Sequence, residues 1–228
     1  GRDRPLVDRH TLELYRGVAA AAALPTGARA LGPGPNVALG GADGPGPDAL
    51  APPGRPAPPA RVLRTVGLGI GTTHQTKRWP HFAGLVTALG RAHPGVRFVL
   101  IGGPADHTEL ERLRGDVDPA VLDPRDAAAL DPVGLLGLLR ELDVLVTVDS
   151  GAAHIAQTIG VPTLVLFGPT SPARWGPSAP PHRALSLGLP CSPCSNVGGA
   201  RCPIEARAHA CLRQLDPELV AREALLVW

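Results

Sequence analysis

The sequence predicts an α/β protein with a doubly wound parallel sheet. Short apolar runs alternate with segments of helical spacing from residue 62 to the end of the chain. One run, residues 144–148, has the hydrophobicity expected of a strand that is covered on both faces. Polar turns that contain glycine follow several of the runs. Strands that alternate with helices in this way are typical of parallel sheets with helices on both sides.

The first sixty residues differ from the rest of the chain. Residues 10–24 have helical spacing and are rich in strong helix formers. Many of the chain's 28 Gly and 27 Pro crowd into residues 25–59, which predicts an irregular connector. We therefore divide the chain into residues 1–60, a helix with a connector, and residues 61–228, a folded domain.

The elements of the folded domain follow from apolar spacing. We expect strands at residues 62–70, 96–101, 144–148 and 163–167. We expect helices at residues 80–92, 106–114, 133–142, 152–159 and 217–228. Pro80 would occupy the first turn of its helix, where a missing N–H costs little.

Composition excludes some classes of function. Charged residues make up 18% of the 228 residues and the formal net charge is +2, too little to indicate nucleic-acid binding. The hydrophobic content of 44% is typical of a soluble globular protein. The longest apolar runs are shorter than the roughly 18 residues of a membrane span. Because the chain begins with Gly1 and contains no Met, we expect a fragment or a processed product.

Two polar turns follow the third and fourth predicted strands: residues 149–154, Asp-Ser-Gly-Ala-Ala-His, and residues 167–170, Phe-Gly-Pro-Thr. The ends of parallel strands meet at one edge of the sheet, where α/β proteins hold ligands. Backbone N–H groups of Ser150 and Gly151 at a helix N-terminus favour an anion. Asp149 would cap that helix, and His154, one turn further on, would return toward the same pocket.

The second of these turns also offers groups to a ligand. Gly168 would let the backbone approach a ligand closely, and Thr170 would offer a hydroxyl. A common Gly-Pro turn without a ligand explains the same residues.

A third polar run, residues 71–80, follows the first predicted strand. Lys77 would act as a point charge on a phosphate, and Thr72 and Thr73 would donate hydroxyl hydrogen bonds to it. The short helix after residue 103 carries Asp106 and Glu109, and an acid in a comparable place binds ribose in dinucleotide folds. An exposed helix face explains those two acids equally well. Together, the three turns predict a site for the pyrophosphate of a nucleotide-linked ligand.

These motifs, in this order, resemble glycosyltransferase family 9, the lipopolysaccharide heptosyltransferase family. The similar segments are residues 76–80 (Thr-Lys-Arg-Trp-Pro), 149–154 and 167–170, followed by Pro172, Arg174 and Gly176-Pro177. The resemblance covers residues 62–228, and residues 10–15 are similar to the helix that joins the two domains of these enzymes. It implies a GT-B fold with two Rossmann-like halves, of which this chain is similar to the C-terminal, donor-binding half.

The resemblance also implies an activity and a set of site residues. The whole enzyme would be an inverting transferase that moves a heptose, from ADP-heptose, to a lipopolysaccharide core or another glycan acceptor. It would act in the cytoplasm, in peripheral association with the inner membrane, and without a cofactor. Its general base would lie in an N-terminal domain, so we expect this chain alone to be inactive. The residues that match donor-binding positions are Thr72, Thr73 and Lys77 for phosphate, Glu109 for ribose, and Asp149, Ser150, Gly151 and His154 for pyrophosphate and sugar.

Two kinds of sequence pattern bear on metal binding: Asp-x-Asp pairs and the four cysteines. We find no Asp-x-Asp pair of the kind that would hold a divalent ion with the donor, so we predict metal-independent transfer. Cys191 and Cys194 form a C-x-x-C pair, and Cys202 and Cys211 follow at wider spacing. This cysteine segment, residues 190–211, is similar to one in many family members. A structural zinc (with His209 able to replace a ligand), disulfides and reduced thiols all remain open.

Two other functions remain compatible with the motifs. A nucleotide-sugar epimerase of the GT-B type would use the same half-fold and would release a free sugar or an epimer without any acceptor. A non-catalytic nucleotide-binding fragment would bind the donor and transfer nothing.

Overall fold

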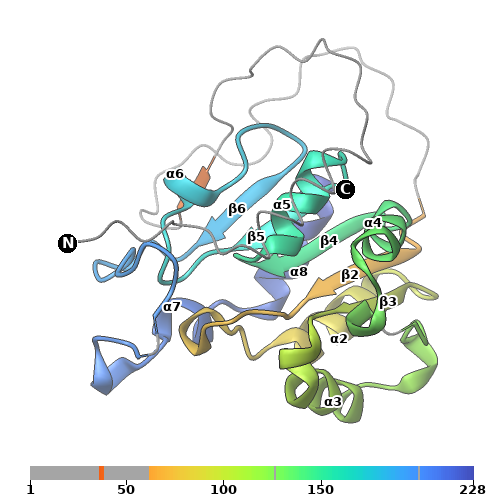
Figure 1. Ribbon diagram of the computed structural model, residues 1–228, viewed down its shortest axis with the longest axis horizontal. Coiled ribbons are helices and arrows are strands. Elements are labelled where there is room, and N and C mark those ends of the chain that lie inside the picture. The colour runs from red at the N-terminus through yellow and green to blue at the C-terminus, as the bar shows by residue number, and fades with distance from the viewer. Residues whose placement is uncertain (1–35, 39–61, 126, 200) are drawn as a thin grey trace.

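The computed structural model describes residues 36–38, 62–125, 127–199 and 201–228. These residues form a six-stranded sheet with helices packed on both faces (Figure 1). The strand order is β1-β6-β5-β4-β2-β3, and every neighbouring pair is parallel. The predicted fold class, a Rossmann-like doubly wound parallel sheet, is therefore confirmed.

Four of the six strands lie where the sequence predicts them, within a few residues. The strands are β1 (Asn36–Ala38), β2 (Thr65–Gly69), β3 (Arg97–Ile101), β4 (Val144–Val148), β5 (Thr163–Leu166) and β6 (Arg183–Ser186). The expectation that residues 25–59 are irregular is wrong at β1, which pairs with β6 in the register Asn36↔Ala184. Strands as short as β1 and β6 carry too few residues for a periodic signal, and pairing with a neighbour defines them.

All five helices predicted within residues 61–228 are present. The helices are α2 (Phe82–Ala92), α3 (His107–Asp116), α4 (Pro132–Arg140), α5 (Gly151–Thr158), α6 (Pro172–Trp175), α7 (Ala210–Arg213) and α8 (Pro217–Val227). The one-turn helices α6 and α7 were not predicted. Pro80 does not lie in the first turn of α2 as expected, because His81 is the N-cap and the helix begins at Phe82.

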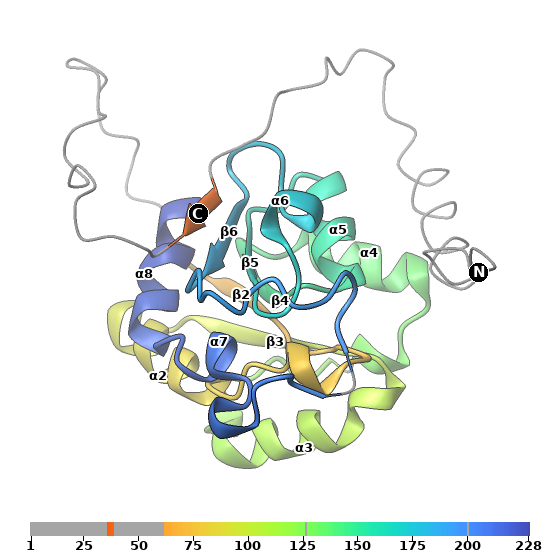
Figure 2. The ribbon, with the colours of Figure 1, turned by 90° about the vertical axis from the view of Figure 1, so that its left-hand side faces the viewer.

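Alternate residues of the strands face opposite helical layers. Val66, Phe98 and Val146 pack in one apolar cluster with α2, α3 and α8, whereas Val99 and Leu145 pack in another with α4 and α5. Figures 1 and 2 show these two layers, with the C-terminal helix α8 beside α2. Coverage on both faces explains why β4 is completely buried.

The candidate site lies where the strand order reverses. From β2 the chain passes through α2 to β3 on one side, and β4 pairs with β2 on its other side. In open α/β sheets such a reversal opens a crevice between two neighbouring turns. Gly69 at the end of β2 leaves room for the Thr147 side chain of β4, since a Cβ atom on Gly69 would lie 2.2 Å from Thr147 Oγ1.

Most of residues 1–60 lie outside the described residues, so the proposed helix at residues 10–24 and the remainder of the connector stay predictions. In the part of the chain that the structure describes, no helix is both long and apolar enough to cross a membrane.

Candidate functional site

A buried ion pair joins the turns that follow β2 and β4. Lys77 Nζ lies 3.3 Å from Asp149 Oδ2, and the two side chains are 12% and 8% exposed. The Thr170 hydroxyl, from the turn after β5, donates to the same Oδ2 atom over 2.7 Å. A buried charge needs partners to offset its desolvation, and Asp149 has both a cation and a hydroxyl. This carboxylate therefore holds three turns together at one edge of the sheet.

His154 of α5 completes this cluster. Its Nε2 atom lies 4.0 Å from Asp149 Oδ1, and its ring centroid lies 6.4 Å from that of Trp175. Burial lowers the pKa of His154, although nearby Asp149 raises it and Lys77 lowers it further. We therefore expect a neutral imidazole near pH 7, with one nitrogen that donates and one that accepts. The expected return of His154 toward the polar turns is confirmed.

The N-terminus of α5 opens at the same place. Ser150 is the N-cap and makes no side-chain capping hydrogen bond; its hydroxyl lies 3.3 Å from Thr147 Oγ1. Gly151 is exposed, and a Cβ atom there would meet nothing within 4 Å. The expectation that Asp149 caps this helix is wrong, because its carboxylate binds Lys77 and Thr170 instead. The first turn of α5 thus follows directly after the Asp149 that pairs with Lys77, and N–H groups at a helix N-terminus favour an anion.

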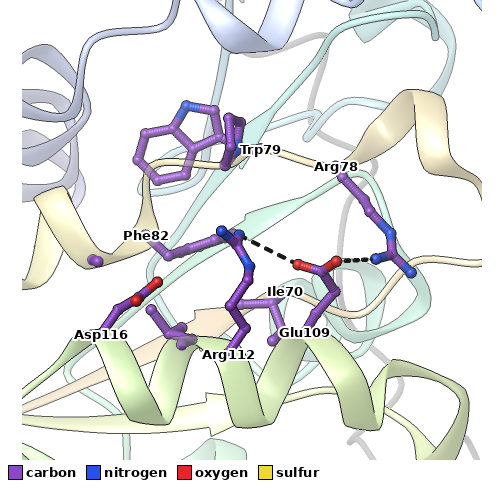
Figure 3. Close-up of a pocket in the computed structure, with 10 residues that line it drawn as sticks. Ile70, Arg78, Trp79, Phe82, Glu109, Arg112 and Asp116 are labelled. Carbon is purple, nitrogen blue, oxygen red and sulfur yellow. Dashed lines mark hydrogen bonds and ion pairs between the residues drawn. The ribbon is translucent and has the colours of Figure 1, made fainter.

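Glu109 lies in a second charged cluster, beside a pocket between α2 and α3 (Figure 3). Its Oε1 accepts from Arg78 Nη1, and its Oε2 lies 3.4 Å from Arg112 Nη2. Ile70, Phe82 and other apolar groups line the same pocket. Consecutive residues Lys77 and Arg78 therefore pair with different elements, Lys77 with the β4 turn and Arg78 with α3.

The threonines of the first turn have different environments. The Thr72 N–H donates to Asp106 Oδ1 over 3.2 Å, and the Thr72 hydroxyl accepts from the His74 N–H over 3.2 Å. Thr73 is exposed. Asp106 is buried and also accepts from the Gly103 N–H. Of the two acids considered for a ribose, Asp106 thus organises loops, whereas Glu109 lies beside the pocket.

The structure corrects two expectations for the turn after β5. A Cβ atom on Gly168 would lie 2.6 Å from Leu212 Cγ and 3.0 Å from Cys211 Sγ. The absence of a side chain at Gly168 therefore makes room for α7, which fills the space where a ligand was expected to approach. Thr170 is fully buried, and its hydroxyl serves Asp149 rather than the crevice.

The segment from residue 187 to 209, which we call the cysteine strap, connects two of the polar turns. Its Gly199 exchanges two hydrogen bonds with the Thr76 hydroxyl, of 2.8 and 3.0 Å. The Cys194 N–H donates to Pro169 O over 2.9 Å, and the Ser192 hydroxyl donates to Gly168 O. We did not predict this role for Thr76, because contacts between residues more than 120 positions apart leave no local pattern in the sequence.

The four cysteines are free thiols in this structure. Burial raises the pKa of Cys194, and it raises that of Cys211 to about 11, with smaller contributions from the neighbouring cysteines. Among the described residues, no group of three or more His, Cys, Asp or Glu side chains is arranged to hold a metal ion.

One Asp-x-Asp sequence, Asp116-Val117-Asp118, is present but does not match the kind expected at a donor site. It follows Glu109 by about two helical turns, at the far end of α3 (Figure 3). Asp118 accepts the Ala120 N–H as an N-cap. Asp116 lines the pocket between α2 and α3 together with Glu109, whereas Asp118 serves as an N-cap, so the two carboxylates have different surroundings.

Comparison with known proteins assigns the chain to a family. The sequence model described as "Glycosyltransferase family 9 (heptosyltransferase)" matches residues 61–201. The chain belongs to glycosyltransferase family 9. The match contains all three motifs that suggested the family, residues 76–80, 149–154 and 167–170.

Relatives within family 9 agree with this assignment. Lipopolysaccharide heptosyltransferase 1 of Pseudomonas aeruginosa is 31% identical over 170 residues, which cover 69% of this chain and 46% of that protein. The solved structure of E. coli ADP-heptose LPS heptosyltransferase II superposes with a TM-score of 0.58 at 26% identity, over 73% of this chain and 47% of that one. The chain thus spans about half the length of these family 9 relatives.

The geometry separates two kinds of residue within the family 9 motifs. Trp79 is 3% exposed, and its indole N–H donates to Leu215 O over 3.0 Å. It therefore anchors the start of α2 to the segment before α8. Lys77, three residues after His74 and at the end of a 3-10 turn (Gln75–Lys77), instead pairs with Asp149 of the turn after β4. One motif thus supplies both an anchor and a charge.

Proposed function

We propose that this chain is the donor-binding part of a heptosyltransferase, a C-terminal GT-B half formed by residues 61–228. It would bind a nucleotide sugar, ADP-heptose, for transfer of the heptose to a lipopolysaccharide core or another glycan acceptor. The names of its relatives, and the ADP-heptose named for the E. coli structure, support this choice. The observation that carries it is the Lys77–Asp149 pair beside the open N-terminus of α5, in the crevice where the strand order reverses.

The proposed roles follow from what each group can do. The Lys77 ammonium and the N–H groups at the start of α5, from Ser150 and Gly151 onward, would bind the two phosphates of the donor. Asp149 would hold Lys77 in position. Glu109, oriented by two arginines, would accept hydrogen bonds from the ribose hydroxyls. His154, a neutral imidazole, would contact the sugar or the nearer phosphate.

Thr72 and Thr73 remain proposed phosphate contacts. The Thr72 hydroxyl accepts from His74 N–H and donates to His74 O over 3.5 Å, so it would have to redirect its hydrogen from that long contact to a phosphate oxygen. Thr73 is exposed at the same turn and can turn its hydroxyl toward the crevice.

In the proposed reaction the acceptor hydroxyl attacks the anomeric carbon as the bond to the β-phosphate oxygen breaks. The nucleoside diphosphate leaves with the bonding electron pair, and a general base takes the proton from the acceptor. Lys77 and the α5 N-terminus would stabilise the leaving charge without requiring a metal ion. Attack opposite the leaving group inverts the anomeric configuration.

We place the general base outside the described crevice, in an N-terminal acceptor domain. The carboxylates assigned to the donor site are engaged, since Asp149 binds Lys77 and Thr170, and Glu109 binds two arginines. An engaged carboxylate is a poor base. We therefore expect this chain alone to bind the donor without catalysing transfer. The whole enzyme would act in the cytoplasm, at the inner face of the membrane.

The test is calorimetric titration of the 228-residue chain with ADP, GDP and UDP. We expect saturable binding of ADP and an affinity lower by about tenfold or more in Lys77→Ala, because one charge-assisted contact is lost. Arg91→Ala is the matched control: it removes an exposed cation of α2 that pairs with Glu218, and ADP affinity should not change. A chain with a normal thermal melt that binds none of the three nucleotides would contradict the proposal.

A chemical feature of the sequence gives an independent readout. Lys77 is the only lysine in the sequence, so its amine and the chain N-terminus are the only reactive amines. An amine-acylating reagent followed by mass spectrometry should modify Lys77 slowly in the presence of saturating ADP and faster in its absence. The N-terminal amine serves as the internal reference for reagent activity.

A further inference from the structure

Trp175 lies beside the candidate site, on an element that the proposed donor contacts do not use. The one-turn helix α6 (Pro172–Trp175) follows β5 and lies near the start of α5, at the edge of the sheet toward which the strands point (Figures 1 and 2). The Trp175 ring lies 6.4 Å from that of His154, tilted by 58°. His154 in turn approaches Asp149. An aromatic surface is thus connected through one histidine to the Lys77–Asp149 pair.

Three contacts fix the orientation of the Trp175 indole. Its Nε1–H donates to Asn196 O of the cysteine strap over 2.6 Å. Part of the ring packs against the apolar cluster of Ala153 and Phe167. The Arg174 guanidinium lies over the ring, 5.2 Å from its centroid. A half-buried tryptophan held in this way keeps its accessible surface in place, so a ligand would meet it at little cost in side-chain entropy.

The positions of the charged groups indicate how a bound donor would be oriented, an argument that rests on the proposed function. Arg78 pairs with Glu109, the proposed ribose contact. Lys77 pairs with one carboxylate oxygen of Asp149, and His154 lies near the other. A nucleoside diphosphate sugar places its two phosphates between ribose and sugar. With ribose at Glu109 and phosphates at Lys77, the sugar extends to the side of His154 and Trp175.

We propose that Trp175 is a specificity-determining residue that recognises the pyranose ring of the donor. The C–H groups of a pyranose form an apolar patch that packs well on an indole, while the sugar hydroxyls remain available to polar groups such as His154. Trp175 distinguishes a sugar-bearing nucleotide from the free nucleotide, because the free nucleotide ends at the phosphates and does not reach the indole.

The experiment compares two ligands across matched variants of the 228-residue chain. Dissociation constants for ADP and for ADP-heptose are measured by calorimetry with the original chain, Trp175→Ala, Trp175→Phe and Trp228→Ala. In Trp175→Ala we expect the ADP-heptose constant to rise about fivefold or more while the ADP constant stays within about twofold. Trp175→Phe keeps an aromatic ring and should retain most of the ADP-heptose affinity. Trp228→Ala removes a tryptophan that packs edge-on to His93 and should change neither constant.

The outcomes separate this inference from the proposed function. If the original chain binds no ADP, the proposed function fails, and that result is known before any variant is compared. If ADP binds and Trp175→Ala weakens both ligands equally, Trp175 only supports the phosphate site, and the inference is overturned. No change for either ligand overturns it as well. Tryptophan fluorescence adds a direct readout: ADP-heptose, but not ADP, should change the emission of the original chain, and Trp175→Phe should abolish that change.

Discussion

At the scale of single residues, Asp149 is the centre of the site. It accepts hydrogen bonds from a lysine and a threonine and lies near a histidine, and these three side chains come from two other turns and α5. Lys77 is the one lysine among 22 basic Lys and Arg residues. The ammonium group of lysine is a compact point charge, whereas the planar guanidinium group of arginine matches the geometry of a carboxylate such as that of Glu109. Here the ammonium of Lys77 pairs with Asp149, whereas the guanidinium groups of Arg78 and Arg112 pair with Glu109.

Thr170 should contribute to stability through Asp149. Thr170→Val keeps the side-chain volume but leaves the buried Asp149 carboxylate with one hydrogen bond fewer, at a cost of about 1–3 kcal/mol in the free energy of unfolding. Urea denaturation measures the difference. Thr87→Val on the exposed side of α2 is the control, and there we expect a change below about 0.5 kcal/mol. Equal effects in the two variants would refute a special role for the Thr170 hydroxyl.

His154 should make stability depend on pH. Burial lowers its pKa below the ordinary value of 6.5, so the unfolded chain binds the proton more tightly than the folded chain. The free energy of unfolding should therefore fall as the pH decreases through 6.5 toward the lowered pKa. His182, whose pKa is also lowered by burial, has the same sign, so His154→Gln must be compared with the original chain. NMR titration of the ring C–H signals should give a His154 midpoint below 6.5; a midpoint above it would contradict the argument.

At the scale of elements, the cysteine strap and α7 are packed against the polar turns. The strap binds the β2 turn through Thr76 and the β5 turn through Pro169, and α7 inserts Leu212 against Gly168. These contacts hold fixed the spacing between two turns of the site. The Phe-Gly-Pro-Thr motif of the family is thus explained largely by packing, and its threonine by the contact with Asp149.

Gly168→Ala should disturb this packing. The added methyl would lie 2.6 Å from Leu212 Cγ, and we expect a loss of about 1–3 kcal/mol in the free energy of unfolding. The double variant with Leu212→Ala should show less than the sum of the two single losses, because the methyl then has room. Gly90→Ala on α2 is the control: a Cβ there meets nothing within 4 Å, and stability should not fall. Additive losses in the double variant would show that the clash is not the cause.

At the scale of the whole molecule, the fold brings distant segments to one edge of a parallel sheet. The turns after β2, β4 and β5 lie up to 93 positions apart in the sequence between Lys77 and Thr170, yet both residues contact Asp149. Helices on both faces bury the strands and leave their ends available for a ligand. The described part of this family 9 chain thus gathers charged and polar groups at one edge of the sheet.

Donor binding by this molecule should not require a metal ion. Lys77 and the α5 N-terminus already offer positive charge to the phosphates, so the ADP dissociation constant should be the same, within about twofold, with EDTA as with added Mg²⁺. Calorimetry of one protein preparation in the two buffers measures it. Binding that is lost in EDTA and restored by Mg²⁺ or Mn²⁺ would contradict the prediction.

The sequence by itself determined the parallel α/β fold, the places of four strands and five helices, and the three polar turns. Periodic apolar spacing and turn residues are local, so a linear reading detects them. Only the tertiary structure decided which partner each polar group takes. Asp149 binds Lys77 and Thr170 rather than capping α5, Gly168 admits Leu212, and β1 pairs with β6. Such contacts form between segments far apart in the chain, and their geometry exists only once the sheet has brought those segments together.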